Sequence, residues 1–89
     1  MSDVQPDVTV YVTEYCGYCV RAKALLDKRG IAYEVVDVTG DHEKRAWLVR
    51  ETGRRTVPQI FIKGESIGGS DELYALDRSG ELAKKLARA

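Results

Sequence analysis

The spacing of apolar residues changes along this chain, and each change predicts a different element. A β-branched run over 8–13 and the alternation over 32–38 are typical of strands. Ala22, Leu25 and Leu26 recur with the period of a helix that has one buried face. The whole pattern predicts strands over 8–13, 32–38, 59–62 and 65–67, and helices over 17–29, 42–52, 70–79 and a short last segment containing Leu82 and Leu86.

Short polar residues and glycines mark the ends of these segments. Asp41 directly precedes a predicted helix, and we expect its side chain to cap that helix. Gly30 and Gly53 follow helices at positions where a residue in the left-handed conformation commonly ends them. Ser70 is followed by two acidic residues, which is typical of the start of a helix.

The order of the elements predicts an α/β fold built on a four-stranded mixed sheet flanked by helices. The first two strands should be parallel, because a helix connects them as a right-handed crossover. The last two should form an antiparallel hairpin around the Lys63-Gly64 turn. The 89 residues are expected to make one domain, with residues 1–7 as a flexible lead-in that ends near Pro6.

Composition excludes several kinds of partner. Lysine and arginine total 14 and aspartate and glutamate total 14, so we expect no binding to nucleic acid or to an anionic membrane. No stretch approaches the ~18 consecutive apolar residues typical of a membrane span. The acidic, polar start of the chain differs from a signal peptide, and we therefore expect a cytoplasmic protein.

The segment Cys16-Gly17-Tyr18-Cys19 contains both cysteines of the chain and lies where the first strand gives way to the first helix. The positive end of the helix dipole favours the thiolate of Cys16, which is the form that attacks disulfides. One alternative is a pair of buried, inert cysteines. Another is half of a zinc site, although a structural zinc takes four ligands and only His42 remains as a histidine.

Three motifs in this order resemble the glutaredoxin family, in particular its small bacterial dithiol members. They are Cys16-Gly17-Tyr18-Cys19, Thr56-Val57-Pro58 and Gly68-Gly69-Ser70-Asp71, and the resemblance covers residues 8–85. It implies a thioredoxin-like fold and a glutathione-dependent thiol–disulfide oxidoreductase. Such a protein would reduce protein–glutathione mixed disulfides and protein disulfides through a Cys16/Cys19 dithiol.

The resemblance also implies roles for particular residues. Cys16 would be the nucleophile, and either free glutathione or Cys19 would resolve the mixed disulfide that Cys16 forms. A cis Val57–Pro58 bond would let the backbone of Val57 pair with an extended thiol peptide. The helix start near Ser70 could hold a carboxylate, while Asp71 could hold an ammonium group. The implied glutathione-binding residues are Tyr18, Arg45, Thr56, Val57, Pro58, Gly69, Ser70 and Asp71.

Two positions depart from the family pattern. Relatives usually have a lysine where this chain has Thr13, so one charge that would stabilise the thiolate and bind a carboxylate is missing. Many relatives have proline where this chain has Gly17. Outside the motifs, the helical pattern puts Trp47 on the polar side of its helix, partly exposed, and makes His42 a surface residue.

Two alternative functions remain open on the sequence. One is an electron-transfer protein served by a flavin reductase, as thioredoxin is, although the Gly68–Asp71 motif argues against it. The other is a carrier of a [2Fe–2S] cluster, with Cys16 of two chains and two glutathione thiolates as the ligands. We expect a monomer that dimerises only around such a cluster, and no other metal.

Overall fold

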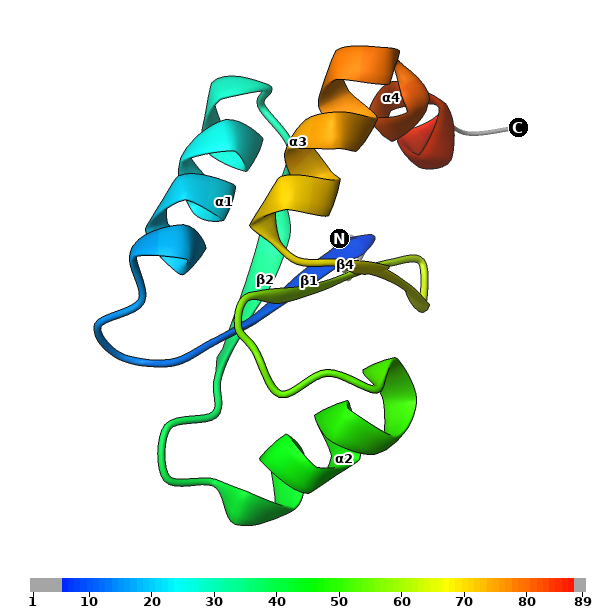
Figure 1. The fold of residues 1–89 in the computed structure, drawn as a ribbon. Helices are drawn as coiled ribbons and strands as arrows, with labels where there is room; N and C mark the ends of the chain where they lie inside the picture. Colours follow the sequence, from blue (N-terminus) through cyan, green and yellow to red (C-terminus); the bar gives the residue numbers. More distant parts are fainter. Residues whose placement is uncertain (1–5, 88–89) are drawn as a thin grey trace, which may run out of the picture.

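The computed structural model describes residues 6–87, so most of the expected lead-in at 1–7 lies outside the described residues. Within the described range, the elements agree closely with the predicted ones (Figure 1). No helix in this part of the chain is long and apolar enough to cross a membrane. The elements in order are β1 (Val8–Val12), α1 (Gly17–Lys28), β2 (Tyr33–Asp37), α2 (His42–Thr52), β3 (Gln59–Ile62), β4 (Glu65–Gly68), α3 (Ser70–Ser79) and α4 (Glu81–Leu86).

The four strands form one mixed sheet in the order β2-β1-β3-β4, which confirms the predicted fold class. β1 and β2 are parallel, with Val10 opposite Val35. β3 is antiparallel to both β1 and β4, and the register to β4 shifts between Ile60 and Phe61. Lys63 at φ 52° and Gly64 at φ 84° form the predicted two-residue turn, in which both residues are left-handed.

Helices α1 and α3 cover one face of the sheet, and α2 lies on the other (Figure 1). Alternate residues of β1 and β3 point toward α1 and α3, because successive side chains of a strand point to opposite faces. The main hydrophobic core lies between this face of the sheet and helices α1 and α3. Its buried side chains are Val8, Val10, Val12, Cys19, Ala22, Leu25, Leu26, Ile60, Ile62, Leu73 and Leu82.

The helix ends follow the chemistry expected from the sequence. The Asp41 side chain accepts a hydrogen bond of 3.0 Å from the Lys44 backbone N–H, so Asp41 caps α2. Gly53 ends α2 at φ 73°, where a residue with a Cβ would be strained. His42 is exposed, as predicted.

The face of the sheet under α2 is aromatic, and this corrects the expectation for Trp47. Trp47 is half-buried, but it faces the sheet rather than the polar side of α2. Its ring lies 5.6 Å from that of Tyr11 and stacks 5.7 Å from that of Phe61. Pairs at such distances add about 0.5–1.5 kcal/mol beyond area burial. Trp47 therefore anchors α2, and the segment that follows it, against the sheet.

Candidate functional site

The cysteine motif lies at the carboxyl end of β1, where the chain turns into α1. Cys16 and Cys19 are joined by a disulfide, with their Cα atoms 5.2 Å apart. Cys16 is the N-cap of α1, and its Sγ accepts a 3.0 Å hydrogen bond from the backbone N–H of Cys19. In the reduced protein, this N–H and the helix dipole would stabilise a thiolate at Cys16.

The two sulfurs differ in their access to solvent. Cys19 is 2% exposed and belongs to the core, whereas Cys16 is only partly buried. The residues around Cys16 are open, since Tyr18 is 58% exposed. An incoming disulfide can therefore reach Cys16, while Cys19 is positioned to attack from inside the helix.

The Thr56-Val57-Pro58 segment lies directly beside the cysteines. The Val57–Pro58 peptide bond is cis, as the resemblance implied. The Val57 carbonyl oxygen is 3.7 Å from Cys16 Sγ. Two distant parts of the sequence thus meet at the sulfur, and an extended peptide bound to Val57 would have its own thiol next to Cys16.

One pocket of about 280 Å³ lies between this segment and the start of α3. We call it the Asp71 pocket. It brings together every glutathione-binding residue that the sequence predicted except Arg45, and adds two that the sequence analysis missed, Arg54 and Glu72. Its lining residues are Tyr18, Arg54, Thr56, Val57, Pro58, Gly69, Ser70, Asp71 and Glu72.

Helix α3 starts at Ser70, as predicted, and Gly69 is its N-cap. The Ser70 hydroxyl is buried without a hydrogen-bond partner among the described residues. Glycine is favoured at position 69, because a Cβ there would lie 3.1 Å from the Pro58 carbonyl oxygen, which is a tight contact. The close approach of these two backbones brings the helix N-terminus up to the Val57–Pro58 segment.

Glu72 links the N-terminus of α3 to the segment between α2 and β3. Its Oε1 accepts a 2.7 Å hydrogen bond from the Gly69 N–H and lies 3.4 Å from Nη1 of Arg54. The hydrogen bond from Gly69 lowers the pKa of the Glu72 carboxyl, and Arg54 acts in the same direction. Glu72 is therefore charged at neutral pH and fixes both the cap of α3 and the side chain of Arg54.

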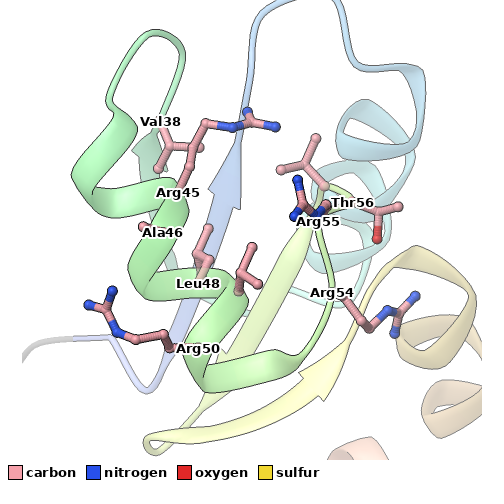
Figure 2. Close-up of a pocket in the computed structure, with 10 residues that line it drawn as sticks. Val38, Arg45, Ala46, Leu48, Arg50, Arg54, Arg55 and Thr56 are labelled. Carbon is pink, nitrogen blue, oxygen red and sulfur yellow. The ribbon is translucent and has the colours of Figure 1, made fainter.

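A second pocket, of about 390 Å³, lies on the other side of Val57 (Figure 2). We call it the Arg45 pocket. It is formed by α2 and the segment from α2 to β3, and its charged lining residues are Arg45, Arg50, Arg54 and Arg55. Figure 2 shows Arg45 and Arg55 extending toward the same opening, while Arg54 extends away from them. Arg54 also lines the Asp71 pocket. The two pockets share Arg54, Thr56 and Val57.

A third pocket lies on the opposite side of the cysteine motif, with Thr13, Cys16, Cys19 and Lys23 among its lining residues. Thr13 and Cys16 therefore line the same pocket. Lys23 supplies a cation to this pocket that the sequence analysis did not identify. Lys23 also helps to lower the pKa of Asp37, although the main cause of that shift is the hydrogen bond from the Thr39 backbone.

No group of three or more histidine, cysteine, aspartate or glutamate side chains within residues 6–87 could hold a metal ion. Half of a zinc site, one of the alternatives for the cysteines, therefore finds no partner ligands in that range. The inert pair is also disfavoured, because Cys16 is partly exposed between two pockets.

Arg54, Arg55 and Glu72 are the site residues that sequence reasoning missed. A signal was present for each of them. The two arginines directly precede the Thr56-Val57-Pro58 motif, and Glu72 stands three residues after a glycine at a helix start, the spacing of a capping residue. What the sequence did not show is the direction in which these side chains extend.

The mixed sheet, the helix-capping cysteine and the adjacent cis-proline segment define a class of protein, the thiol–disulfide oxidoreductases of thioredoxin-like fold. Comparison with known proteins narrows this class. Residues 8–67 match the glutaredoxin family model. The chain is 47% identical to glutaredoxin 3 of Escherichia coli K12 over 76 residues, which are 85% of this chain and 92% of that protein.

Other relatives support the same family assignment. A Pseudomonas aeruginosa glutaredoxin is 46% identical over 77 residues, which cover 86% of this chain and 92% of the relative. Among solved structures, the buckwheat glutaredoxin–glutathione complex superposes with a TM-score of 0.85 at 36% identity, covering 91% of this chain and 76% of that one. The Brucella melitensis glutaredoxin has a TM-score of 0.81 at 41% identity, covering 96% and 94%. This chain belongs to the glutaredoxin family.

Proposed function

We propose that this protein is a glutathione-dependent oxidoreductase that reduces protein–glutathione mixed disulfides and protein disulfides. The observation that carries the proposal is the meeting of the Asp71 and Arg45 pockets at Val57, next to Cys16 Sγ. At about 280 Å³ the Asp71 pocket is just below the ~300–1,000 Å³ typical of ligand sites, and at about 390 Å³ the Arg45 pocket is at the small end of that range. A tripeptide with charged groups at both ends would have to occupy both pockets.

Glutathione matches the charges of this groove. Its γ-glutamyl end carries an ammonium and a carboxylate, which suit Asp71 and the backbone N–H groups at the start of α3. Its cysteinyl unit would pair with the backbone of Val57, with Tyr18 as one wall of the groove. Its glycine carboxylate would then lie toward Arg45. The complex of buckwheat glutaredoxin with glutathione supports this use of the fold.

The chemistry follows from the two sulfurs. The Cys16 thiolate attacks the glutathione sulfur of a mixed disulfide, and the client thiolate leaves and takes up a proton. A second glutathione thiolate can attack the sulfur of the glutathione bound to Cys16, which releases oxidised glutathione and regenerates the Cys16 thiolate. Alternatively, the Cys19 thiolate attacks the Cys16 sulfur, which releases glutathione and forms the disulfide seen here.

A coupled assay with glutathione, glutathione reductase and a small glutathione mixed disulfide tests the proposal. Cys16→Ser should abolish turnover, because it removes the only accessible sulfur of the motif. Cys19→Ser should retain turnover of the mixed disulfide but lose the reduction of protein disulfides. Equal loss in both variants with the mixed disulfide would refute the assignment of roles.

A carrier of a [2Fe–2S] cluster is the alternative function that the sequence left open. Such a cluster takes four thiolates, and this chain could offer only Cys16, because Cys19 is buried. Two chains and two glutathione molecules would be required. Anaerobic reconstitution with iron, sulfide and glutathione distinguishes the cases: a coloured dimer that Cys16→Ser abolishes supports the carrier, and a colourless monomer rules it out. The monomeric state and the cytoplasmic location stay predictions.

A further inference from the structure

The groove that passes Val57 has opposite charges at its two ends. The Asp71 pocket contains the carboxylates of Asp71 and Glu72 together with the guanidinium of Arg54, which lies 3.4 Å from Glu72, so Asp71 is the negative charge without an ion-pair partner among the described residues. The Arg45 pocket, as far as the described residues define it, is lined by arginines and by no acidic side chain. The chain as a whole has no net charge, so this difference is a local property of the groove.

The Arg45 pocket, at the positive end of the groove, carries more positive charge than glutathione requires. Arg45 alone can pair with the single glycine carboxylate of glutathione. Arg55 extends toward the same opening (Figure 2), and neither arginine takes part in an ion pair among the described residues. Arg54 differs, because Glu72 lies 3.4 Å from it. Arg55 is therefore an exposed cation beside the groove that forms no ion pair with the described residues.

The backbone of Val57 fixes the direction in which a longer peptide would run. A residue can exchange both of its backbone hydrogen bonds with a single partner residue only in an antiparallel pair. If a client cysteine pairs in this way with Val57, the residues that follow the cysteine lie opposite those that precede Val57. The second residue after the client cysteine then lies opposite Arg55, and residues before the cysteine lie toward Pro58 and the Asp71 pocket.

We infer that this groove selects client disulfides whose reactive cysteine is followed by acidic residues. The inference rests on the proposed function and names a class of protein substrate for it. Acidic residues after the cysteine meet Arg45 and Arg55, whereas acidic residues before it approach Asp71, where like charges repel. Basic residues should have the opposite preference.

The reaction is the dithiol route. The Cys16 thiolate attacks one sulfur of the client disulfide and forms a mixed disulfide, and the other client sulfur leaves as a thiolate and takes up a proton. The Cys19 thiolate then attacks the Cys16 sulfur, which releases the bound client thiolate. Two electrons pass from the dithiol to the client disulfide, and glutathione restores the dithiol.

Symmetric disulfide-linked dimers of a short cysteine peptide test the inference, because attack on either sulfur is equivalent. One dimer has paired aspartates directly after the cysteine, and the other has the same residues directly before it. The rates are measured with pre-reduced protein by acid quenching and chromatography. Each rate is divided by the rate with dithiothreitol, which removes the effect of the aspartates on the disulfide itself.

We expect the dimer with aspartates after the cysteine to react about fivefold faster at low salt, which corresponds to about 1 kcal/mol. High salt should reduce the ratio toward one, because the arginines are exposed. Lysines in place of the aspartates should invert the preference. Arg55→Gln should lower the ratio to about twofold, whereas Arg78→Gln, a matched loss of charge in the last turn of α3, should leave it unchanged.

A variant that merely disturbs the fold would slow both dimers equally and would not change the ratio. Equal rates for the two dimers in the unaltered protein would overturn the inference. Failure to reduce either dimer would overturn it as well, provided that the small glutathione mixed disulfide is turned over. Failure with that mixed disulfide would instead refute the proposed function.

Discussion

Glu72→Gln tests whether a single carboxylate stabilises the corner on which the proposed groove depends. The Glu72 carboxylate accepts a 2.7 Å hydrogen bond from the Gly69 N–H and lies 3.4 Å from Arg54. Glutamine keeps the size of the side chain and an oxygen that can accept from Gly69. The substitution therefore removes the charge while leaving the shape of the corner almost unchanged.

The expected loss follows from these contacts. A hydrogen bond to a charged group contributes about 1.5–3 kcal/mol and a neutral one about 0.5–1.5, so the difference is about 1 kcal/mol. The ion pair adds little, because the side chains of Arg54 and Glu72 are 44% and 45% exposed and solvent screens them. We expect the free energy of unfolding to fall by about 1 kcal/mol at neutral pH.

The dependence on pH distinguishes charge from packing. The pKa of Glu72 in the folded protein lies below its ordinary value of 4.5, mainly because of the Gly69 hydrogen bond. A lowered carboxyl pKa stabilises the fold above the unfolded-state pKa, and the contribution is lost as the pH falls through the folded-state value. The difference between the two proteins should therefore vanish in acid.

Urea unfolding of the oxidised proteins at neutral pH and at a pH below the lowered value measures this difference directly. Glu51→Gln is the control, because Glu51 is exposed on α2 and a surface change there should stay within about 0.5 kcal/mol at both pH values. A loss for Glu72→Gln that is equally large at both pH values would refute the electrostatic reasoning. It would show that the glutamine amide simply packs poorly in this corner.

The remaining predictions concern recognition of glutathione and reactivity of the thiol. Asp71→Asn should weaken recognition of a glutathione mixed disulfide by about 1–3 kcal/mol, the range for a hydrogen bond to a charged group, and should leave alkylation of Cys16 nearly unchanged. Equal effects on both reactions would mean that Asp71 acts on the thiol or the fold. Thr13→Lys should speed alkylation of reduced Cys16 near neutral pH, because a cation in the pocket that both residues line favours the thiolate. An unchanged rate across a pH series would contradict this.

Most of the fold could be predicted from the sequence because its signals are local. The β-branched run of β1, the cap at Asp41 and the left-handed glycine at position 53 each act within a few residues. The family motifs then supplied the one non-local feature that periodicity lacks, the meeting of Val57 with Cys16. The predicted strand over 32–38 is longer than β2 because Val38, although buried, follows the last residue of the ladder.

Side chains whose surroundings come from distant segments could not be predicted. Trp47 has polar neighbours along its helix, and its true partners, Tyr11 and Phe61, lie on two different strands. The direction of Arg55 depends on how the segment after α2 reaches β3, and no local pattern encodes that path. The start of α3 at Ser70 was visible in the sequence, but the close approach of Gly69 to the Pro58 carbonyl oxygen was not, because it joins two distant segments.

The shared position of Val57 has a consequence for the order of events in the proposed reaction. The Asp71 and Arg45 pockets have Arg54, Thr56 and Val57 in common, so a client peptide and glutathione that both pair with Val57 must use the groove in turn. A glutathione bound to Cys16 leaves the surface beyond the two pockets open to a second glutathione thiolate, whereas a longer client chain bound to Cys16 also covers that surface. Cys19 avoids this conflict, because it reaches Cys16 from the buried side of α1, where it is 2% exposed. Reduction of protein disulfides should for this reason depend on Cys19 far more strongly than reduction of glutathione mixed disulfides does.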